Sequence, residues 1–290
     1  MESFTMPGGA ALLLEGGSLR GLYTAGALDA LMEADLYFPA VAGVSAGSLN
    51  GVNYVAHQPG RAASINLRYR HDPRYFGPKA ALNGGSLFGL RFMLYDLPKE
   101  IPFDAGTFYH GGQRMIAVAT SVRTGKPAYF EKGRTSFDFL EACRASASLP
   151  LVSVPVRLDG EPYLDGGCSC PIPLHWAQQE GFAKIVIITT REKGFRKQLP
   201  GQRMIDLYDD FYGDKPLFLA AMLTQEARYN ALMDEIDALE AAGQVFVLRP
   251  ARPIEIGRFE GNVEKLLDVY NRGRREMRET LPALRAYLEA

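Results

Sequence analysis

Two short apolar segments, each followed by a glycine-containing turn and a helical pattern, constrain the fold of this chain more than any other feature. Residues 10–14 are continuously apolar and end at Gly16-Gly17, and apolar side chains then recur at helical spacing over residues 20–33. Residues 38–44 and 46–55 repeat this order, with a second buried strand and a helix of small residues. Because strands that alternate with helices in this way form a parallel sheet, the sequence predicts an α/β fold.

The rest of the chain predicts further elements of the same domain. Strands are expected at residues 115–121, 127–130, 152–158, 162–164, 185–190 and 245–248, and helices at 137–146, at about 216–242 and from 262 onward. Residues 57–112 hold helical segments broken by glycine and proline, which we interpret as a cap or lid over one edge of the sheet. No internal repeat or low-complexity linker divides the chain. We therefore expect one domain over residues 1–290, with a core at about 8–212 and a C-terminal extension at about 213–290.

Charge and composition argue against several classes of protein. The chain has 32 Lys and Arg against 33 Asp and Glu, whereas a nucleic-acid-binding protein usually needs a basic face. Three cysteines fit a reducing compartment. The first seven residues lack the basic start and apolar run of a signal peptide, and no apolar run approaches the roughly 18 residues that cross a bilayer. We expect a cytoplasmic protein that is at most peripheral at a membrane.

The sharpest local motif is Gly43-Val44-Ser45-Ala46-Gly47, a G-x-S-x-G between a predicted strand and a predicted helix. A sharp turn at this place pushes the serine hydroxyl out of the sheet, and only small neighbours let the backbone bend so tightly. The start of the helix also favours negative charge as a tetrahedral intermediate forms. Ser45 is therefore the candidate nucleophile.

A serine nucleophile needs a base, and the histidines are poorly placed to supply one. Ser45 follows only two predicted strands, whereas an α/β-hydrolase has several strands before its serine and a histidine after its acid. His175 is the last histidine, and His57, His71 and His110 fall in the helical insert. A standard Ser-His-Asp triad is therefore disfavoured.

Asp165-Gly166-Gly167 offers a carboxylate instead. The motif ends a predicted strand, and the two glycines would let the carboxylate approach another loop closely. An ordinary Asp-Gly turn is the other interpretation, and spacing alone does not separate the two.

Residues 15–21 form a third motif, a glycine-rich loop between a predicted strand and a predicted helix. Such a loop presents backbone N–H groups to an anion, either a phosphate or a developing oxyanion. It is neither a dinucleotide fingerprint, because Ser18 replaces the middle glycine, nor a P-loop, because no G-K-[ST] follows. A tight structural turn is the alternative.

In this order the three motifs resemble those of the patatin-like phospholipase family, which has a glycine-rich oxyanion loop, a nucleophile elbow and an Asp-Gly-Gly or Asp-Gly-Ala. Residues 145–150, Ala-Ser-Ala-Ser-Leu-Pro, are similar to the stretch that family members place before the acid. Residues 249–273 resemble the C-terminal extension of bacterial members. The resemblance implies a three-layer α/β/α sandwich with a mostly parallel central sheet and a helical insert.

The same resemblance implies a Ser-Asp dyad that hydrolyses acyl esters of lipids without histidine, metal or cofactor. Ser45 would attack the ester carbonyl, Asp165 would accept its proton, and the N–H groups of Gly16, Gly17 and Ser18 would hold the oxyanion. The remaining motif positions are Arg20, Gly21, Gly43, Gly47, Gly166 and Gly167. Burial of the acid should raise its pKa and make it a better base.

Two positions depart from the family pattern. Ser18 stands where members often have glycine; it still offers a backbone N–H, so the oxyanion hole remains possible if the φ of Ser18 is negative. Cys170 stands where members often have a polar residue, and we expect a buried structural thiol.

Two apolar segments, residues 87–95 and 216–223, could line an acyl groove or form a lid, although ordinary core packing is the alternative for each. Two other functions also stay open. One is an esterase or thioesterase on short soluble acyl groups with the same dyad. The other is a non-catalytic relative that binds lipids or anions.

Overall fold

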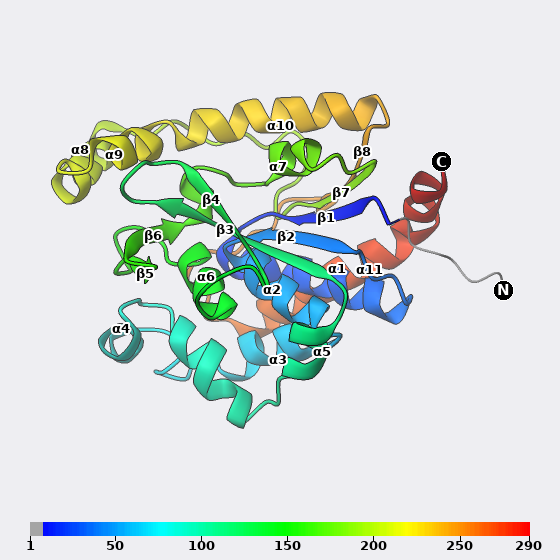
Figure 1. The fold of residues 1–290 in the computed structure, drawn as a ribbon, viewed down its shortest axis with the longest axis horizontal. Coiled ribbons are helices and arrows are strands. Elements are labelled where there is room, and N and C mark those ends of the chain that lie inside the picture. The colour runs from blue at the N-terminus through cyan, green and yellow to red at the C-terminus, as the bar shows by residue number, and fades with distance from the viewer. Residues whose placement is uncertain (1–7) are drawn as a thin grey trace.

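A central sheet of eight strands organises the protein, in the order β5-β6-β3-β2-β1-β7-β8 with β4 also paired to β3 (Figure 1). The computed structural model describes residues 8–290, so the first seven residues, which were considered above for a signal peptide, lie outside the described residues. Five neighbouring strands, β3, β2, β1, β7 and β8, run parallel, whereas the pairs β3–β4, β3–β6 and β5–β6 are antiparallel. The predicted α/β fold with a mostly parallel sheet is confirmed. The strands are β1 Ala10–Leu14, β2 Ala40–Val44, β3 Arg114–Ser121, β4 Pro127–Glu131, β5 Val156–Leu158, β6 Glu161–Asp165, β7 Lys184–Ile188 and β8 Val245–Leu248.

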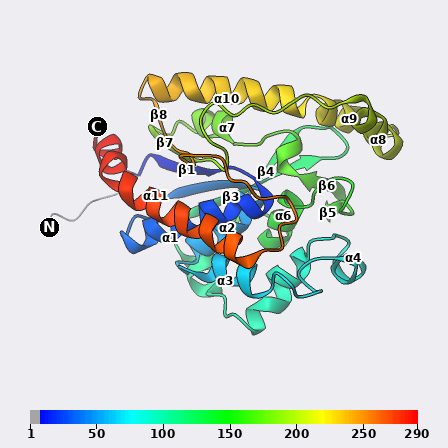
Figure 2. The same ribbon diagram turned by 180° about the vertical axis from the view of Figure 1, so that it is seen from behind.

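Helices cover both faces of the sheet. The helices are α1 Gly21–Glu33, α2 Ala46–Val55, α3 Arg61–Arg68, α4 Pro78–Gly84, α5 Ala105–His110, α6 Phe139–Ser146, α7 Leu174–Gln179, α8 Gln202–Tyr212, α9 Pro216–Leu223, α10 Gln225–Ala241 and α11 Val263–Glu289. Short helical turns lie at η1 Ser18–Arg20, η2 Phe92–Asp96, η3 Leu97–Lys99 and η4 Gly166–Cys168. Figures 1 and 2 show α7 and α10 over one face, and α1, α2 and α11 over the other.

The continuous apolar run of β1 is explained by these two layers. Leu12 and Leu14 face the layer with α1 and α2, whereas Ala11 and Leu13 pack with the side chains of α7 and α10. All five residues of β1 are completely buried. A central strand covered on both faces has no solvent side, so its sequence does not alternate between apolar and polar residues.

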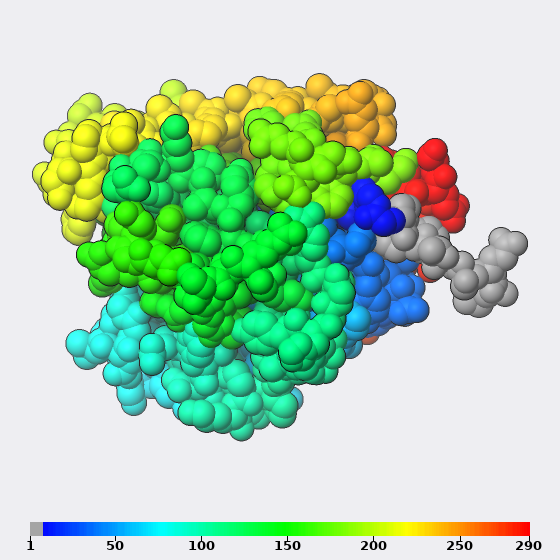
Figure 3. All heavy atoms as spheres, viewed as in Figure 1, coloured from blue at the N-terminus to red at the C-terminus, as the bar shows by residue number. Residues whose placement is uncertain are grey.

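The insert predicted at residues 57–112 contains α3, α4 and α5 and the turns η2 and η3. Figure 3 shows this insert (cyan) and the α8–α9 pair (yellow) at the same end of the molecule, on either side of the β5–β6 hairpin. No helix within residues 8–290 combines the length and the apolar composition needed to cross a membrane.

Two helical regions differ from the sequence-based expectation. The long helix expected at about residues 216–242 is interrupted at Thr224, which separates α9 from α10. The Thr224 hydroxyl donates to Ala220 O at 2.8 Å and accepts from the Arg228 guanidinium at 2.6 Å. Such local side-chain bonds compete with the helical ladder. Helices α7 and α8 were not predicted.

The C-terminal helix α11 lies along α1 at very short range (Figure 2). A Cβ atom at Gly26 would lie 2.0 Å from Tyr270 O, and one at Gly273 would lie 2.0 Å from Tyr23 O, so two glycines allow the helix backbones to touch. The Tyr23 hydroxyl donates to Glu276 at 2.8 Å, across the same contact. The C-terminal region is therefore firmly attached to the sheet domain.

Candidate active site

Ser45 lies at the turn between β2 and α2, and its backbone is strained. Its φ of 55° and ψ of −124° are unusual for a residue with a side chain and cost about 1–3 kcal/mol. Neighbouring glycines let the surrounding loops close on the turn, because a Cβ at Gly47 would lie 2.4 Å from Leu14 O and one at Gly43 would lie 2.6 Å from Gly47 C. The Ser45 N–H donates to Ser146 Oγ at 2.9 Å and so helps to hold the turn.

The pairing of β3 explains how Asp165 comes close to Ser45. Val44 at the end of β2 pairs with Val118, and the next residue of β3, Ala119, pairs with Asp165 at the end of β6. Gly166 makes this approach possible, since a Cβ there would lie 2.1 Å from Val118 O. The carboxyl ends of β2 and β6 therefore meet across β3.

Asp165 forms hydrogen bonds through its backbone N–H, its backbone carbonyl and one of its carboxyl oxygens. The Asp165 N–H donates to Ser148 O at 2.8 Å, and Asp165 O accepts from the Thr120 hydroxyl at 2.8 Å. Oδ1 accepts from the Gly167 N–H at 2.8 Å. Only the second carboxyl oxygen is left for other contacts.

That second oxygen, Asp165 Oδ2, is buried and has no partner of normal hydrogen-bond geometry within residues 8–290. Burial raises the pKa of Asp165 to about 6, and interactions with the Ser45 hydroxyl and the Gly167 N–H limit this rise. Ser45 Oγ is therefore close to the Asp165 carboxyl group, but it forms no hydrogen bond of normal length and angle with it. The serine and the acid are thus brought together around one unsatisfied carboxyl oxygen.

The glycine-rich loop packs directly against this pair. A Cβ at Gly16 would lie 3.0 Å from Ser45 Cβ, and one at Gly17 would lie 2.5 Å from Thr190 Oγ1. None of the backbone N–H groups of Gly16, Gly17 and Ser18 donates a hydrogen bond within the described part of the chain. Three consecutive donors are therefore free beside Ser45.

The condition of a negative φ at Ser18 is not met, because its φ is 52°. The chain turns there from the glycine loop into η1, and the left-handed conformation explains why glycine would suit this position. The Ser18 hydroxyl donates to Arg258 O at 3.4 Å. The N–H of Ser18 nevertheless remains unbonded.

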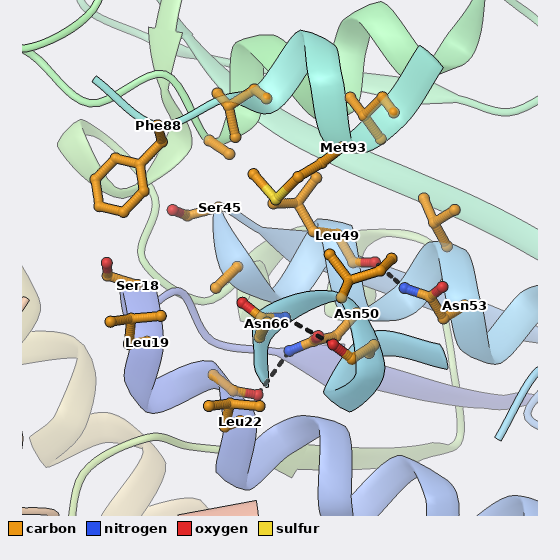
Figure 4. Close-up of a pocket in the computed structure, with 18 of the residues that line it drawn as sticks. Ser18, Leu19, Leu22, Ser45, Leu49, Asn50, Asn53, Asn66, Phe88 and Met93 are labelled. Atoms are coloured by element: carbon orange, nitrogen blue, oxygen red, sulfur yellow. Dashed lines mark hydrogen bonds between the residues drawn. The ribbon is translucent and has the colours of Figure 1, made fainter. Parts of the chain in front are cut away.

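Two cavities meet at Ser45. A narrow cavity of about 90 Å³ and a wide chamber of about 440 Å³ share Ser18, Ser45 and Leu149 in their walls. Figure 4 shows Ser18 and Ser45 at the same end of the narrow cavity, with Leu49 and Met93 farther along it. Asp165 and the glycine loop line the wide chamber.

The insert contributes to the narrow cavity. Phe88, Leu90, Met93 and Leu94 all lie in its wall, so residues 87–95 line a groove as well as packing in the core. From residues 216–223, Met222 lines the wide chamber, whereas Phe218 is buried in the core.

None of the four histidines lines either cavity. His57 stacks on Tyr37 with a centroid distance of 3.9 Å, and His175 lies 2.8 Å from Glu235. The described residues also contain no group of three or more His, Cys, Asp or Glu arranged to hold a metal ion.

The remaining predicted residues divide between the site and its support. Arg20 lines the wide chamber. Gly21 lets α1 approach α2, since a Cβ there would lie 2.8 Å from Ala46 Cβ. Cys170 lines neither cavity, and its thiol donates to Ile172 O at 3.5 Å.

Several residues of the site escaped sequence analysis. Ser146, which supports the Ser45 turn, lies inside the recognised stretch 145–150, but nothing there distinguishes it from Ser148. Three cations of the wide chamber, Arg191, Lys197 and Arg258, belong to no motif.

A family model described as patatin-like phospholipase matches residues 12–177. A second model, a domain of unknown function, matches residues 215–289. Over 284 residues the chain is 29% identical to the uncharacterized protein YjjU of Escherichia coli K12, covering 92% of this chain and 76% of that protein.

Two solved structures are similar at low identity. VipD from Legionella pneumophila is 12% identical with a TM-score of 0.46, over 94% of this chain and 66% of that one. The type III effector protein ExoU is 13% identical with a TM-score of 0.43, over 97% of this chain and 54% of that one. The chain thus spans less than two thirds of the length of either structure. Because the patatin-like model matches more than half of the chain and includes both Ser45 and Asp165, the chain belongs to the patatin-like phospholipase family.

Proposed function

We propose that this protein is a serine acyl hydrolase that cleaves carboxylic esters of lipids through a dyad of Ser45 and Asp165. One observation carries the proposal: a serine on a strained strand-to-helix turn lies beside a buried carboxyl group with one unsatisfied oxygen. Free N–H groups of the glycine loop line the same chamber. Nucleophile, base and oxyanion donors are the three parts that acyl transfer requires.

In the proposed reaction, Ser45 Oγ attacks the ester carbonyl carbon while Asp165 Oδ2 takes its proton. The N–H groups of Gly16, Gly17 and Ser18 stabilise the oxyanion that forms. When the C–O bond breaks, the leaving alcohol takes the proton from Asp165 and an acyl-Ser45 ester remains. Water then attacks this ester with Asp165 as base, which releases the carboxylic acid and restores Ser45.

The pKa of Asp165 suits this role. At about 6 it is higher than that of an ordinary aspartate, so the carboxylate is a better base, yet it is still mostly ionised at pH 7.

Each cavity would hold one side of the ester. The narrow cavity is lined by Leu19, Leu22, Leu49 and Met93 and would take the acyl chain. The wide chamber would take the alcohol part. The small volume of the narrow cavity also favours a second candidate, an esterase or thioesterase that uses the same dyad on short, soluble acyl groups.

A lipid surface is the proposed source of substrate. Met204, Leu207 and Phe211 expose 40%, 36% and 54% of their surface, and their spacing places them on one face of α8. Leu217 on α9 is also exposed, and Met204 lines the wide chamber. This apolar face beside the chamber supports peripheral contact with a membrane, and the three free thiols fit a cytoplasmic protein.

The dyad is tested by substitution. Ser45→Ala and Asp165→Asn should each lower kcat/KM for a p-nitrophenyl acyl ester by at least about 10³-fold, because each removes one chemical partner of the attack. Ser64→Ala and Asp159→Asn, which change residues outside both cavities, are the matched controls. A fluorophosphonate probe should label wild-type protein at Ser45, as read by peptide mass spectrometry.

The outcomes distinguish the candidates. Labelling at another residue, or full activity in either dyad variant, would remove the dyad. A rate that jumps when the substrate forms micelles supports a lipid hydrolase, and a smooth hyperbola through that concentration supports the soluble-ester enzyme. Vesicle binding without hydrolysis of any ester would leave a non-catalytic lipid-binding protein.

A further inference from the structure

One part of the wall of the narrow cavity is polar. Asn53, Arg61, Asn66 and Tyr75 all lie in this wall, together with the apolar residues described above. Asn53 belongs to α2, Arg61 and Asn66 belong to α3, and Tyr75 follows α3. A cavity for a plain hydrocarbon chain needs none of these groups, because buried polar atoms cost free energy unless they are hydrogen-bonded. The polar part of the wall therefore points to a second feature of the bound chain.

These polar groups lie far from the nucleophile along α2. Ser45 immediately precedes α2, and about 12 Å along the helix axis, at 1.5 Å per residue, separate it from Asn53. Figure 4 shows Ser45, Leu49 and Asn53 in this order across the cavity. The Arg61 guanidinium donates through Nη1 to Asn53 Oδ1 at 2.8 Å, so it belongs to the same distant end.

The Arg61 guanidinium is buried among neutral partners. The residue is 8% exposed, and besides Asn53 it donates to Pro102 O at 3.0 Å and to Ile101 O at 3.3 Å. The guanidinium carbon lies 5.1 Å from the centre of the Phe103 ring. A guanidinium group has five N–H bonds, and the three hydrogen bonds do not use all of them. Its positive charge and part of its hydrogen-bonding capacity therefore remain available.

Other buried arginines of this protein have a carboxylate partner. The side chains of Arg249 and Arg272 are each 6% exposed, and they pair with Asp237 at 2.7 Å and Glu276 at 3.0 Å. Arg61 forms no such pair within residues 8–290, and burial lowers its pKa to about 10. It is also the one charged side chain among the described residues that line the narrow cavity. A cation in this position gains more from an anion than a cation at the surface does.

Hydrogen bonds hold the neighbouring side chains in place. Asn53 Nδ2 donates at 2.9 Å to the carbonyl group of Leu49, one turn earlier in α2. Asn66 Oδ1 accepts from the Tyr75 hydroxyl at 2.6 Å, and Asn66 Nδ2 donates to Ala62 O at 2.8 Å. The polar end of the cavity is therefore already organised before a ligand binds, which lowers the cost of binding one.

We propose that the narrow cavity accepts an acyl chain that ends in a carboxylate, and that this carboxylate pairs with Arg61. The substrate is then a half-ester of a dicarboxylic acid, with its esterified end at Ser45 and its ionised end at the guanidinium group. Guanidinium and carboxylate groups form strong charge-assisted hydrogen bonds. Because the folded protein has already removed this cation from water, binding has to desolvate only the carboxylate. This inference rests on the proposed function, since it requires the acyl carbonyl to lie at Ser45.

The test compares p-nitrophenyl esters in pairs with the same number of acyl carbons: the half-esters of adipic, suberic and sebacic acid against the hexanoate, octanoate and decanoate. In at least one pair, wild-type protein should show a kcat/KM at least about tenfold higher for the half-ester, mainly through KM. In Arg61→Met the same pair should favour the alkyl ester about tenfold, because the carboxylate would enter the cavity without a partner. Equal or lower kcat/KM for the half-ester in all three wild-type pairs would overturn the proposal.

Arg68→Met is the matched control, because Arg68 is an exposed arginine of the same helix and lies outside both cavities. It should keep the wild-type preference, and a reversal in this variant as well would contradict a specific role for Arg61. Thermal unfolding of both variants shows whether they fold, since Arg61 also holds the carbonyl groups of Ile101 and Pro102.

A second measurement needs no variant of Arg61. The free carboxyl group of the half-ester should titrate near pH 4.3, like a glutamate side chain. The ratio of the two kcat/KM values in wild-type protein should therefore fall several-fold from pH 6 to pH 4, whereas the ionisation of Asp165 affects both esters and cancels. A preference that stays constant over this range would show that the charge is not recognised, and the proposal would be wrong.

Binding separates this inference from the proposed function. Monoethyl suberate is titrated into Ser45→Ala protein by calorimetry, and binding should weaken at least about tenfold in the double variant with Arg61→Met. Binding that depends on Arg61, without hydrolysis of any ester by wild-type protein, would support the anion site and remove the enzyme. Hydrolysis of alkyl esters without binding of monoethyl suberate would keep the enzyme and overturn the anion site.

A further comparison identifies the source of the acyl chain. Wild-type protein is given a phosphatidylcholine with one suberoyl chain, and the soluble p-nitrophenyl half-ester of suberic acid. Release of suberic acid from both would support a lipid with a carboxylate-ended chain as substrate. Release from the soluble half-ester alone would support a soluble half-ester. Release from neither would overturn the substrate class.

Discussion

The narrow cavity and the wide chamber share Ser45 but differ in which part of the chain builds them. Every residue in the wall of the narrow cavity lies between Ser18 and Leu149, within the region matched by the patatin-like model. The wide chamber also takes residues from Arg191 to Arg258, beyond that region. Selection of the acyl chain is thus expected to depend on the family region alone, and selection of the alcohol part on the later half of the chain.

The two spaces also differ in their chemistry. Apolar side chains from α1, α2 and the insert form most of the wall of the narrow cavity, which suits a chain that gains from leaving water. Asn50, Asn53, Arg61 and Asn66 also lie in this wall. The wall of the wide chamber combines apolar side chains with both acidic and basic ones, and binding near the charged ones depends on pairing each charge.

The largest expected effect is the dependence of the rate on pH, which reports on a residue of the wide chamber. In the proposed reaction Asp165, which lines the wide chamber, must be ionised to accept a proton, so its pKa of about 6 should govern the rate with a neutral ester. We expect kcat/KM to be level above pH 7 and to fall about tenfold per pH unit below 6, which is roughly 100-fold at pH 4. The profile is measured with a soluble p-nitrophenyl ester by stopped assays. A midpoint near pH 4 for the neutral ester would mean that burial does not hold the pKa of Asp165 where the structure indicates.

Much of the site could be predicted from sequence, because its most specific parts are local. The segment from Ala10 to Val55 contains strand, glycine loop, helix, strand, elbow and helix in continuous order, and each has its own pattern. By contrast, the approach of Asp165 to Ser45 depends on β3 pairing with two strands that are distant in sequence. Only the resemblance to a family connected these two residues.

The cations of the wide chamber show what sequence patterns leave out. Arg258 lies in a segment without regular structure, and an arginine there has no distinguishing spacing. Its place depends on α11 packing against α1 through Gly26 and Gly273 and on ring contacts with the insert. The positive φ of Ser18 escaped prediction for a similar reason, since it follows from how the loop meets its neighbours.

Matched methionine substitutions should distinguish the narrow cavity from the wide chamber, with a smaller effect on the rate than the change of pH. Met93 lines the narrow cavity and Met204 the wide chamber. Met93→Ala should lengthen the preferred acyl chain, and each additional buried methylene is worth about 0.8 kcal/mol, or roughly fourfold in kcat/KM. Met204→Ala makes the same change in the other space and should leave the chain-length preference unaltered. Rates with p-nitrophenyl butyrate, hexanoate and octanoate measure this, and an identical shift in both variants would contradict separate cavities.

The smallest expected effect is on stability, and it comes from backbone strain at the two serines where the narrow cavity and the wide chamber meet. Ser18 and Ser45 both line the two cavities and both have positive φ values, of 52° and 55°. Ser18→Gly should raise the free energy of unfolding by about 0.5–1 kcal/mol, because glycine adopts this φ without a clash, although the unfolded chain also gains entropy. Asp35→Gly, at a φ of 55° away from both cavities, is the matched control, and urea unfolding measures both.

Ser45→Gly should stabilise more, since its ψ of −124° places it farther from a conformation that side chains tolerate. A loss of stability in Ser18→Gly, with a gain in Asp35→Gly, would mean that the Ser18 hydroxyl contact with Arg258 O outweighs the strain and helps to hold the C-terminal segment over the site.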